Sequence, residues 1–104
     1  MNRRVVITGV GLVTPLGIGV EETWQALCAG KSGVAEISSF DATGFATRIA
    51  AEVKGFNPAD YLPTKEAKRT STLIAYAIAA TRMALADSGL KIDDSNGARL
   101  GGMT

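Results

Sequence analysis

The chain has 104 residues, a net charge of +1 and a hydrophobic share of 46%, which exclude a disordered tail and favour one domain or part of one. Nucleic-acid binders usually carry a large, clustered cationic surplus, so no nucleic-acid partner is expected. The sequence holds no histidine and one cysteine, Cys28. Catalysis by Ser-His-Asp or Cys-His groups, imidazole zinc sites and internal disulfides are therefore excluded within this chain.

The apolar runs of the sequence are short. None approaches the roughly 18 residues that a membrane span needs, and the two arginines near the N-terminus are not followed by the long apolar stretch of a signal peptide. We therefore expect a cytoplasmic protein with no membrane partner.

The chain opens with "RRVVITGVGLVTPLG", in which Val5–Thr8 is typical of a short buried strand that runs into a Gly-rich loop. A dinucleotide-binding turn would follow the pattern G-x-G-x-x-G and lead directly into a helix. Here Thr14 stands at the third glycine position and Pro15 follows it. The pattern therefore disfavours a nucleotide site.

A helix is predicted over residues 20–29, because apolar residues recur there on one face and Gly30 follows as a natural end. That face includes Trp24 and Cys28. A thiol near a helix C-terminus is not activated, because reactive thiolates favour helix N-termini. We therefore interpret Cys28 as a small buried apolar residue and not as a nucleophile.

The middle of the chain is mostly irregular. The segments "GKSG" and "SSFDATGF" are typical of loops, and residues 48–53 are compatible with a short edge strand. "NPADYL" predicts a single helical turn with Asn57 as its cap and Pro58 as its first helical residue.

The longest predicted element is a helix over Lys65–Ser88, capped by Thr64 and ended by Gly89. Its many alanines allow neighbouring elements to approach the helix closely on several sides. The weak helix formers at 69–72, "RTST", predict a kink or break. The "DDSNG" segment fits a turn better than a calcium loop, and "RLGGMT" resembles the start of a strand. The element order predicts an α/β fold with an incomplete sheet.

A cationic cluster marks the beginning of this helix. Lys65, Lys68 and Arg69 are spaced to share one helix face, and cations at a helix N-terminus oppose the dipole. Such a placement favours a docking surface for an anionic partner. An ordinary solvated face explains the same residues equally well at this stage.

The chain also resembles the β-ketoacyl-acyl carrier protein synthases, most of all the type II condensing enzymes of bacterial fatty acid synthesis. The resemblance rests on the opening motif and on "ETWQALCAGKSG", "FDATGFATRIAAEVKGF", "DSGL" and "ARLG". It implies a thiolase-like layered α-β-α-β-α fold, of which residues 1–104 would form the N-terminal part and stop near a strand after Arg99. Val5–Thr8 would be a central strand, with Gly9 and Gly11 serving tight backbone packing.

The resemblance further implies decarboxylative Claisen condensation of an acyl thioester with malonyl-carrier protein. The family's catalytic cysteine and two histidines would lie beyond Thr104, so this chain holds no catalytic residue and binds no cofactor or metal. Substrates would arrive on the phosphopantetheine of an acyl carrier protein, docked at Lys65, Lys68 and Arg69, on a homodimeric full-length enzyme. Ser71 replaces the acidic residue that relatives often carry there. The alternatives are a non-catalytic chain-length-factor-like relative, a polyketide ketosynthase and a stand-alone carrier-docking module.

Overall fold

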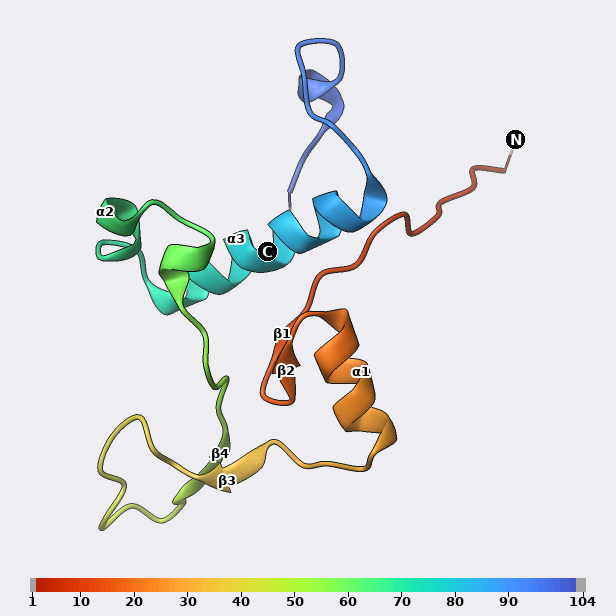
Figure 1. Ribbon diagram of the computed structural model, residues 1–104. Coiled ribbons are helices and arrows are strands. Elements are labelled where there is room, and N and C mark those ends of the chain that lie inside the picture. Colours follow the sequence, from red (N-terminus) through yellow and green to blue (C-terminus); the bar gives the residue numbers. More distant parts are fainter. Residues whose placement is uncertain (1, 103–104) are drawn as a thin grey trace. The chain divides into compact units, whose positions relative to one another are not determined.

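The computed structural model describes residues 2–102 and divides the chain into two compact units. Unit A comprises residues 12–57, and unit B comprises residues 2–11 together with residues 58–102. Figure 1 shows their elements in chain order. Unit A carries both small sheets and the helix α1, and unit B carries α2, α3 and two 3-10 turns.

Unit A begins with a tight hairpin followed by a helix. Strand β1 (Val13–Thr14) pairs antiparallel with β2 (Gly17–Ile18), and the Thr14 hydroxyl accepts the backbone N–H of Leu16 and of Gly17, each at 3.2 Å. Helix α1 (Val20–Cys28) confirms the predicted helix, which we had extended by one residue. The Glu22 carboxylate accepts the Ile18 N–H at 3.0 Å and thereby ties the start of α1 to the hairpin.

The buried side of α1 differs from the predicted one. Thr23 and Ala26 are its buried residues, whereas Trp24 is 62% exposed and Leu27 is 55% exposed. Cys28 is also exposed, so the prediction that it is a buried apolar residue is wrong. Small side chains fit against the hairpin, as the shared hydrogen bond between the Thr23 and Thr14 hydroxyls at 3.0 Å shows, and the larger ones are left on the open side.

A second hairpin completes unit A. Strand β3 (Val34–Glu36) pairs antiparallel with β4 (Ile49–Ala51), with Ala35 opposite Ala50. The predicted edge strand at 48–53 is confirmed, but its partner β3 lies between the two predicted loops, in a stretch for which no strand is predicted. A three-residue strand next to "GKSG" carries too little pattern to be recognised without its partner.

In unit B the predicted long helix is two helices. A 3-10 turn, η1 (Pro58–Asp60), confirms the single turn at Pro58, and α2 (Thr64–Ala67) is separated from α3 (Thr72–Ser88). The predicted break at "RTST" is confirmed. The Thr70 hydroxyl donates to the Glu66 carbonyl at 2.7 Å, and Ser71 is extended, with ψ of 155°. Thr64 is the first residue of α2 and not its cap, because Pro63 occupies the cap position.

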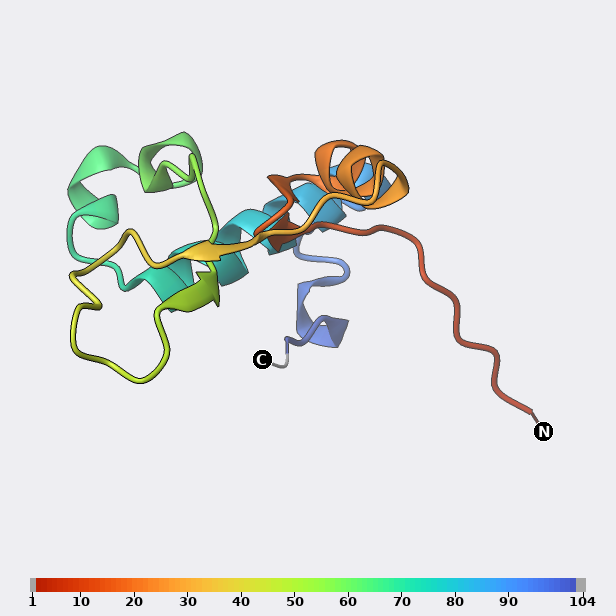
Figure 2. The ribbon, with the colours of Figure 1, turned by 90° about the horizontal axis from the view of Figure 1, so that it is seen from below.

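The end of the N-terminal segment of unit B, at residues 9–11, lies against α3, whereas the start of the segment runs away from it (Figure 1; Figure 2). A Cβ added at Gly11 would stand 2.0 Å from the Ala80 carbonyl oxygen, and one at Gly9 would stand 2.3 Å from the Ala84 carbonyl oxygen. Any side chain at either position would therefore displace the helix backbone. The Val10 N–H also donates to the Asp87 carboxylate at 3.0 Å. The expected role of Gly9 and Gly11 in tight backbone packing is confirmed.

Val5–Thr8 is not a strand in this structure, contrary to prediction. Val5 is 92% exposed and Ile7 is 86% exposed, and no pairing partner for this segment exists among residues 2–102. A strand is defined by hydrogen bonds to a neighbour, so extended β-branched residues without one remain an irregular segment.

The end of the described chain is a loop with a short turn. Helix α3 ends at Gly89, whose φ of 71° is left-handed as the cap requires. The second 3-10 turn, η2 (Gly97–Arg99), follows. Residues 100–102 form no strand, so the predicted strand does not begin there, and its remaining residues, 103 and 104, lie outside the described range. Helices and two small antiparallel sheets give a partial α/β fold.

Candidate functional site

The strongest candidate site is the cationic cluster, defined here as Lys65, Lys68 and Arg69. Lys65 lies in α2, Lys68 is its C-terminal cap residue and Arg69 directly follows. All three side chains are exposed. The Lys68 N–H donates to the Thr64 carbonyl and the Arg69 N–H donates to the Glu66 carbonyl, so the helical winding continues through the cluster and keeps the three cations on one turn.

The cluster stands on a folded base. Leu62, just before α2, is buried, and its N–H donates to the Pro58 carbonyl at 2.9 Å. Turn η1 contacts both α2 and α3. The side chains of the cluster thus project from a fixed backbone, which reduces the entropy lost when a partner binds.

The cluster does not lie at the start of the long helix, contrary to prediction. The sequence pattern placed these cations at the N-terminal end of the longest helix, where the dipole would assist anion binding. In the structure α3 begins only at Thr72, after the extended Ser71, and α2 is a single turn of four residues. The attraction for an anion therefore rests on three neighbouring cationic side chains and not on a helix dipole.

The Gly-rich opening does not form a phosphate site. The two glycines that would cradle a phosphate face the backbone of α3 at separations that leave no space even for a methyl group. A phosphate-binding turn needs open backbone N–H groups, yet the Val10 N–H is bound to Asp87. The structure supports the packing interpretation over the nucleotide one.

Among residues 2–102, no side chain with a perturbed pKa is suited to acid–base catalysis. Hydrogen bonds from Ser39 and Ser38 lower the pKa of Glu52 to about 2. Hydrogen bonds from Thr43 lower the pKa of Asp41, and those from Ser95 lower that of Asp93. General acids and bases need pKa values near the working pH, whereas these carboxylates are held ionised. They stabilise local turns.

The calcium-loop and metal interpretations find no support. Asp93 accepts the N–H and hydroxyl of Ser95, so "DDSNG" forms the predicted turn. Within residues 2–102, no three or more His, Cys, Asp or Glu side chains gather as a metal site would require. Over the same residues, no helix combines the length and the apolar character needed to cross a membrane.

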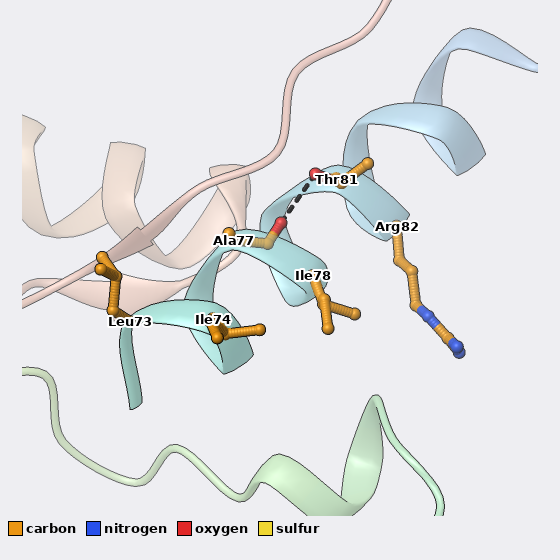
Figure 3. A pocket seen from close by; sticks show the side chains of 6 residues that line it. All are labelled: Leu73, Ile74, Ala77, Ile78, Thr81 and Arg82. Atoms are coloured by element: carbon orange, nitrogen blue, oxygen red, sulfur yellow. Dashed lines mark hydrogen bonds between the residues drawn. The ribbon is translucent and has the colours of Figure 1, made fainter. Parts of the chain in front are cut away.

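An apolar hollow of about 680 Å³ lies along one side of α3 (Figure 3). It is lined by side chains of this helix alone, namely Leu73, Ile74, Ala77, Ile78, Thr81 and Arg82. Leu73 is 78% exposed and Ile74 is 52% exposed. The alanine-rich helix is predicted to be packed on several sides, and among the described residues the structure leaves this side open.

A second hollow, of about 390 Å³, lies at the base of the loop between β3 and β4. Its wall carries Arg48 together with the carboxylates of Glu36 and Asp41. The edge-to-face pair of Phe40 and Phe45, with ring centroids 5.8 Å apart, stiffens this loop. Charges of both signs line the hollow, so it carries no uniform cationic lining for an anionic ligand.

Comparison with known proteins finds relatives along almost the whole chain. The family model of the β-ketoacyl synthase N-terminal domain matches residues 2–104. A curated relative from Coxiella burnetii, named 3-oxoacyl-[acyl-carrier-protein] synthase 2, is 52% identical over 100 residues, covering 96% of this chain and 24% of its own length. The protein of the same name from Vibrio cholerae is 48% identical with the same coverage.

Two solved structures share the fold. The ishigamide ketosynthase/chain length factor matches 90% of this chain and 23% of its own, with a TM-score of 0.76 and 41% identity. A β-ketoacyl synthase from Burkholderia phymatum matches with the same coverage and identity and a TM-score of 0.70. This chain spans about a quarter of the length of these relatives. It belongs to the family of the β-ketoacyl synthase N-terminal domain.

Proposed function

We propose that this chain is the N-terminal segment of a 3-oxoacyl-[acyl-carrier-protein] synthase that extends acyl chains in fatty acid synthesis. The observation that carries the proposal is the match to relatives of that name over 96% of the chain. The reaction joins an acyl thioester to malonyl-carrier protein with loss of carbon dioxide. This chain contains no histidine, so the catalytic cysteine and histidines that the family resemblance implies belong to the remainder of the full-length protein.

Within this segment the proposed role is to dock the acidic acyl carrier protein on Lys65, Lys68 and Arg69. Three exposed cations on one turn create a local positive potential that speeds encounter with an acidic surface. The carrier delivers its substrates on phosphopantetheine, so the protein itself uses no further cofactor or metal in this proposal. The full-length protein is proposed to act as a homodimer in the cytoplasm.

The proposed full-length fold is the layered thiolase-like arrangement. The β-branched segment Val5–Thr8 supports it, because exposed residues of that kind are suited to pairing with strands from the rest of the protein. The apolar side of α3 supports it as well, since a helix with apolar residues on most sides belongs inside a larger protein.

The docking proposal is tested in the full-length protein with the double variant Lys65→Glu/Arg69→Glu. The apparent KM for the carrier-bound substrate is expected to rise about tenfold or more, because charge reversal turns attraction into repulsion. The turnover number at saturating carrier stays within about twofold. Lys31→Glu, which reverses an exposed cation of unit A, is the matched control and should leave the KM unchanged. An unaltered KM in the double variant would remove the docking role.

A second candidate is a non-catalytic partner subunit of the chain-length-factor type. It is favoured by one of the structural matches, which pairs a ketosynthase with a chain length factor. Incubation of the full-length protein with carrier protein that bears an acyl thioester distinguishes the two candidates. A synthase acquires a covalent acyl thioester that mass spectrometry detects, whereas a non-catalytic subunit acquires none.

A further inference from the structure

The loop that follows α3 contains the step Asn96-Gly97. Asparagine followed by glycine is chemically labile, because glycine has no side chain to keep its backbone nitrogen from the asparagine side-chain carbonyl. In the reaction the deprotonated Gly97 nitrogen forms a bond to Cγ of Asn96, the Cγ–Nδ2 bond breaks, and ammonia leaves with the proton. Water then opens the resulting cyclic imide to aspartate or isoaspartate.

In the folded loop, hydrogen bonds hold the backbone nitrogen and the side-chain amide atoms that this reaction needs. The Gly97 N–H donates to the Asp93 carbonyl at 2.8 Å. The Asn96 side-chain oxygen accepts the Asp93 N–H at 3.0 Å, and its Nδ2 donates to the Lys91 carbonyl at 2.8 Å. All three hydrogen bonds must break before the nitrogen can attack and ammonia can leave.

The backbone of Asn96 also opposes ring closure. The imide requires the Gly97 nitrogen and the Cβ of Asn96 to lie on the same side of the Cα–C bond. The observed ψ of −12° instead turns the Gly97 nitrogen toward the backbone nitrogen of Asn96. The residue must therefore rotate out of its folded conformation before the reaction can begin.

We propose that Asn96 is a site of conditional deamidation. The closed loop preserves its side-chain amide, and the amide is lost as ammonia when the loop opens. The deamidated product does not restore the closed loop. The product carboxylate has no N–H to donate to the Lys91 carbonyl, and it adds a negative charge next to Asp93 and Asp94. Deamidated Asn96 should thus accumulate only in molecules in which the segment that follows α3 has opened.

The proposal is tested by incubating the full-length protein at mildly alkaline pH and following the conversion at Asn96 by peptide mass spectrometry. Three hydrogen bonds of ordinary net strength should slow the conversion at least about tenfold in the folded protein relative to the same protein unfolded in guanidinium. Asp93→Ala removes the carboxylate that holds Ser95 and should accelerate the conversion several-fold. Asp94→Ala, an exposed neighbour in the same loop, is the matched control and should leave the rate unchanged.

Two results would overturn the proposal. A folded protein that converts as fast as the unfolded one would show that the loop gives no protection, and an unfolded protein that does not convert would show that the step is not reactive. Equal acceleration by Asp93→Ala and Asp94→Ala would also count against it, because the effect would then follow from charge and not from the closed loop.

Discussion

Helices α2 and α3 follow each other in the chain and serve opposite purposes. Helix α3 has 17 residues, is rich in alanine and accepts the N-terminal segment so closely that only glycine fits at Gly9 and Gly11. Helix α2 has four residues and buries none of them, and the cationic cluster begins on it at Lys65 and continues over the two residues that follow its end. The extended Ser71 separates the packing helix α3 from the proposed docking surface.

The difference between the helices lies in the kind of free energy each contributes. Close backbone contact stabilises the fold and tolerates no added atom. Exposed cations contribute little to stability but set the rate and the salt dependence of association. Substitutions in the two helices should therefore separate into effects on unfolding and effects on carrier binding.

The largest effect is expected for Gly11→Ala. Its new Cβ would overlap the Ala80 carbonyl and approach the Ala84 nitrogen, so the N-terminal segment must move away from α3. We expect the free energy of unfolding of the full-length protein to fall by about 3 kcal/mol, measured by chemical denaturation. Gly101→Ala is the matched control, because nothing lies within 4 Å of its Cβ position. Equal stability of the two variants would refute the packing role.

The reverse result is expected for Lys65→Glu/Arg69→Glu. Both side chains are exposed, so the unfolding free energy should change by less than about 1 kcal/mol while the KM for the carrier rises. Denaturation and kinetics on the same preparation separate the two effects. A loss of stability comparable to that of Gly11→Ala would show that the cluster is structural.

A smaller effect, dependent on pH, is expected at Glu52. Its carboxylate accepts the Ser38 N–H at 2.8 Å and the Ser39 N–H at 3.1 Å, which lowers its pKa from 4.5 to about 2. A lowered folded-state pKa gives stability that is present above pH 4.5 and is lost as the pH falls toward 2. Glu52→Gln should reduce the melting temperature at neutral pH and flatten this acid dependence. An unchanged acid profile would mean that the contact is absent in solution.

The smallest effect is expected for Cys28→Ala. The thiol is exposed and lies at the C-terminal end of α1, where a helix does not activate it. Turnover of the full-length protein should therefore stay within about twofold of the original. An inactive variant with normal stability would show that the thiol takes part in the reaction.

Local signals predicted the elements that depend on local physics. The spacing of apolar residues together with Gly30 predicts α1, the Asn57-Pro58 pair predicts the single turn, and Gly89 predicts the end of α3. The weak helix formers at 69–72 gave the break that isolates the cluster. The sequence predicts that the three cations share one face, which the structure confirms as one exposed turn, but it places them at the start of a longer helix and not before α3. Their docking role stays a prediction.

The wrong predictions depend on partners that are far away in the sequence. Val5–Thr8 has the composition of a strand but no neighbour among the described residues, and β3 becomes a strand only because β4 pairs with it. Trp24 and Cys28 lie on an apolar stripe that nothing in unit A covers. Composition indicates that a face is apolar, whereas only the partner decides whether it is buried.

The most direct test of the account is the affinity of the full-length protein for acyl carrier protein, measured by calorimetry at low and at high salt. Binding should weaken as salt rises. Lys65→Glu/Arg69→Glu should both lower the affinity and remove most of this salt dependence, whereas Lys31→Glu should do neither. Equal affinity and equal salt dependence in the original protein and the double variant would contradict it, because the cationic cluster would then have no part in recognising the carrier.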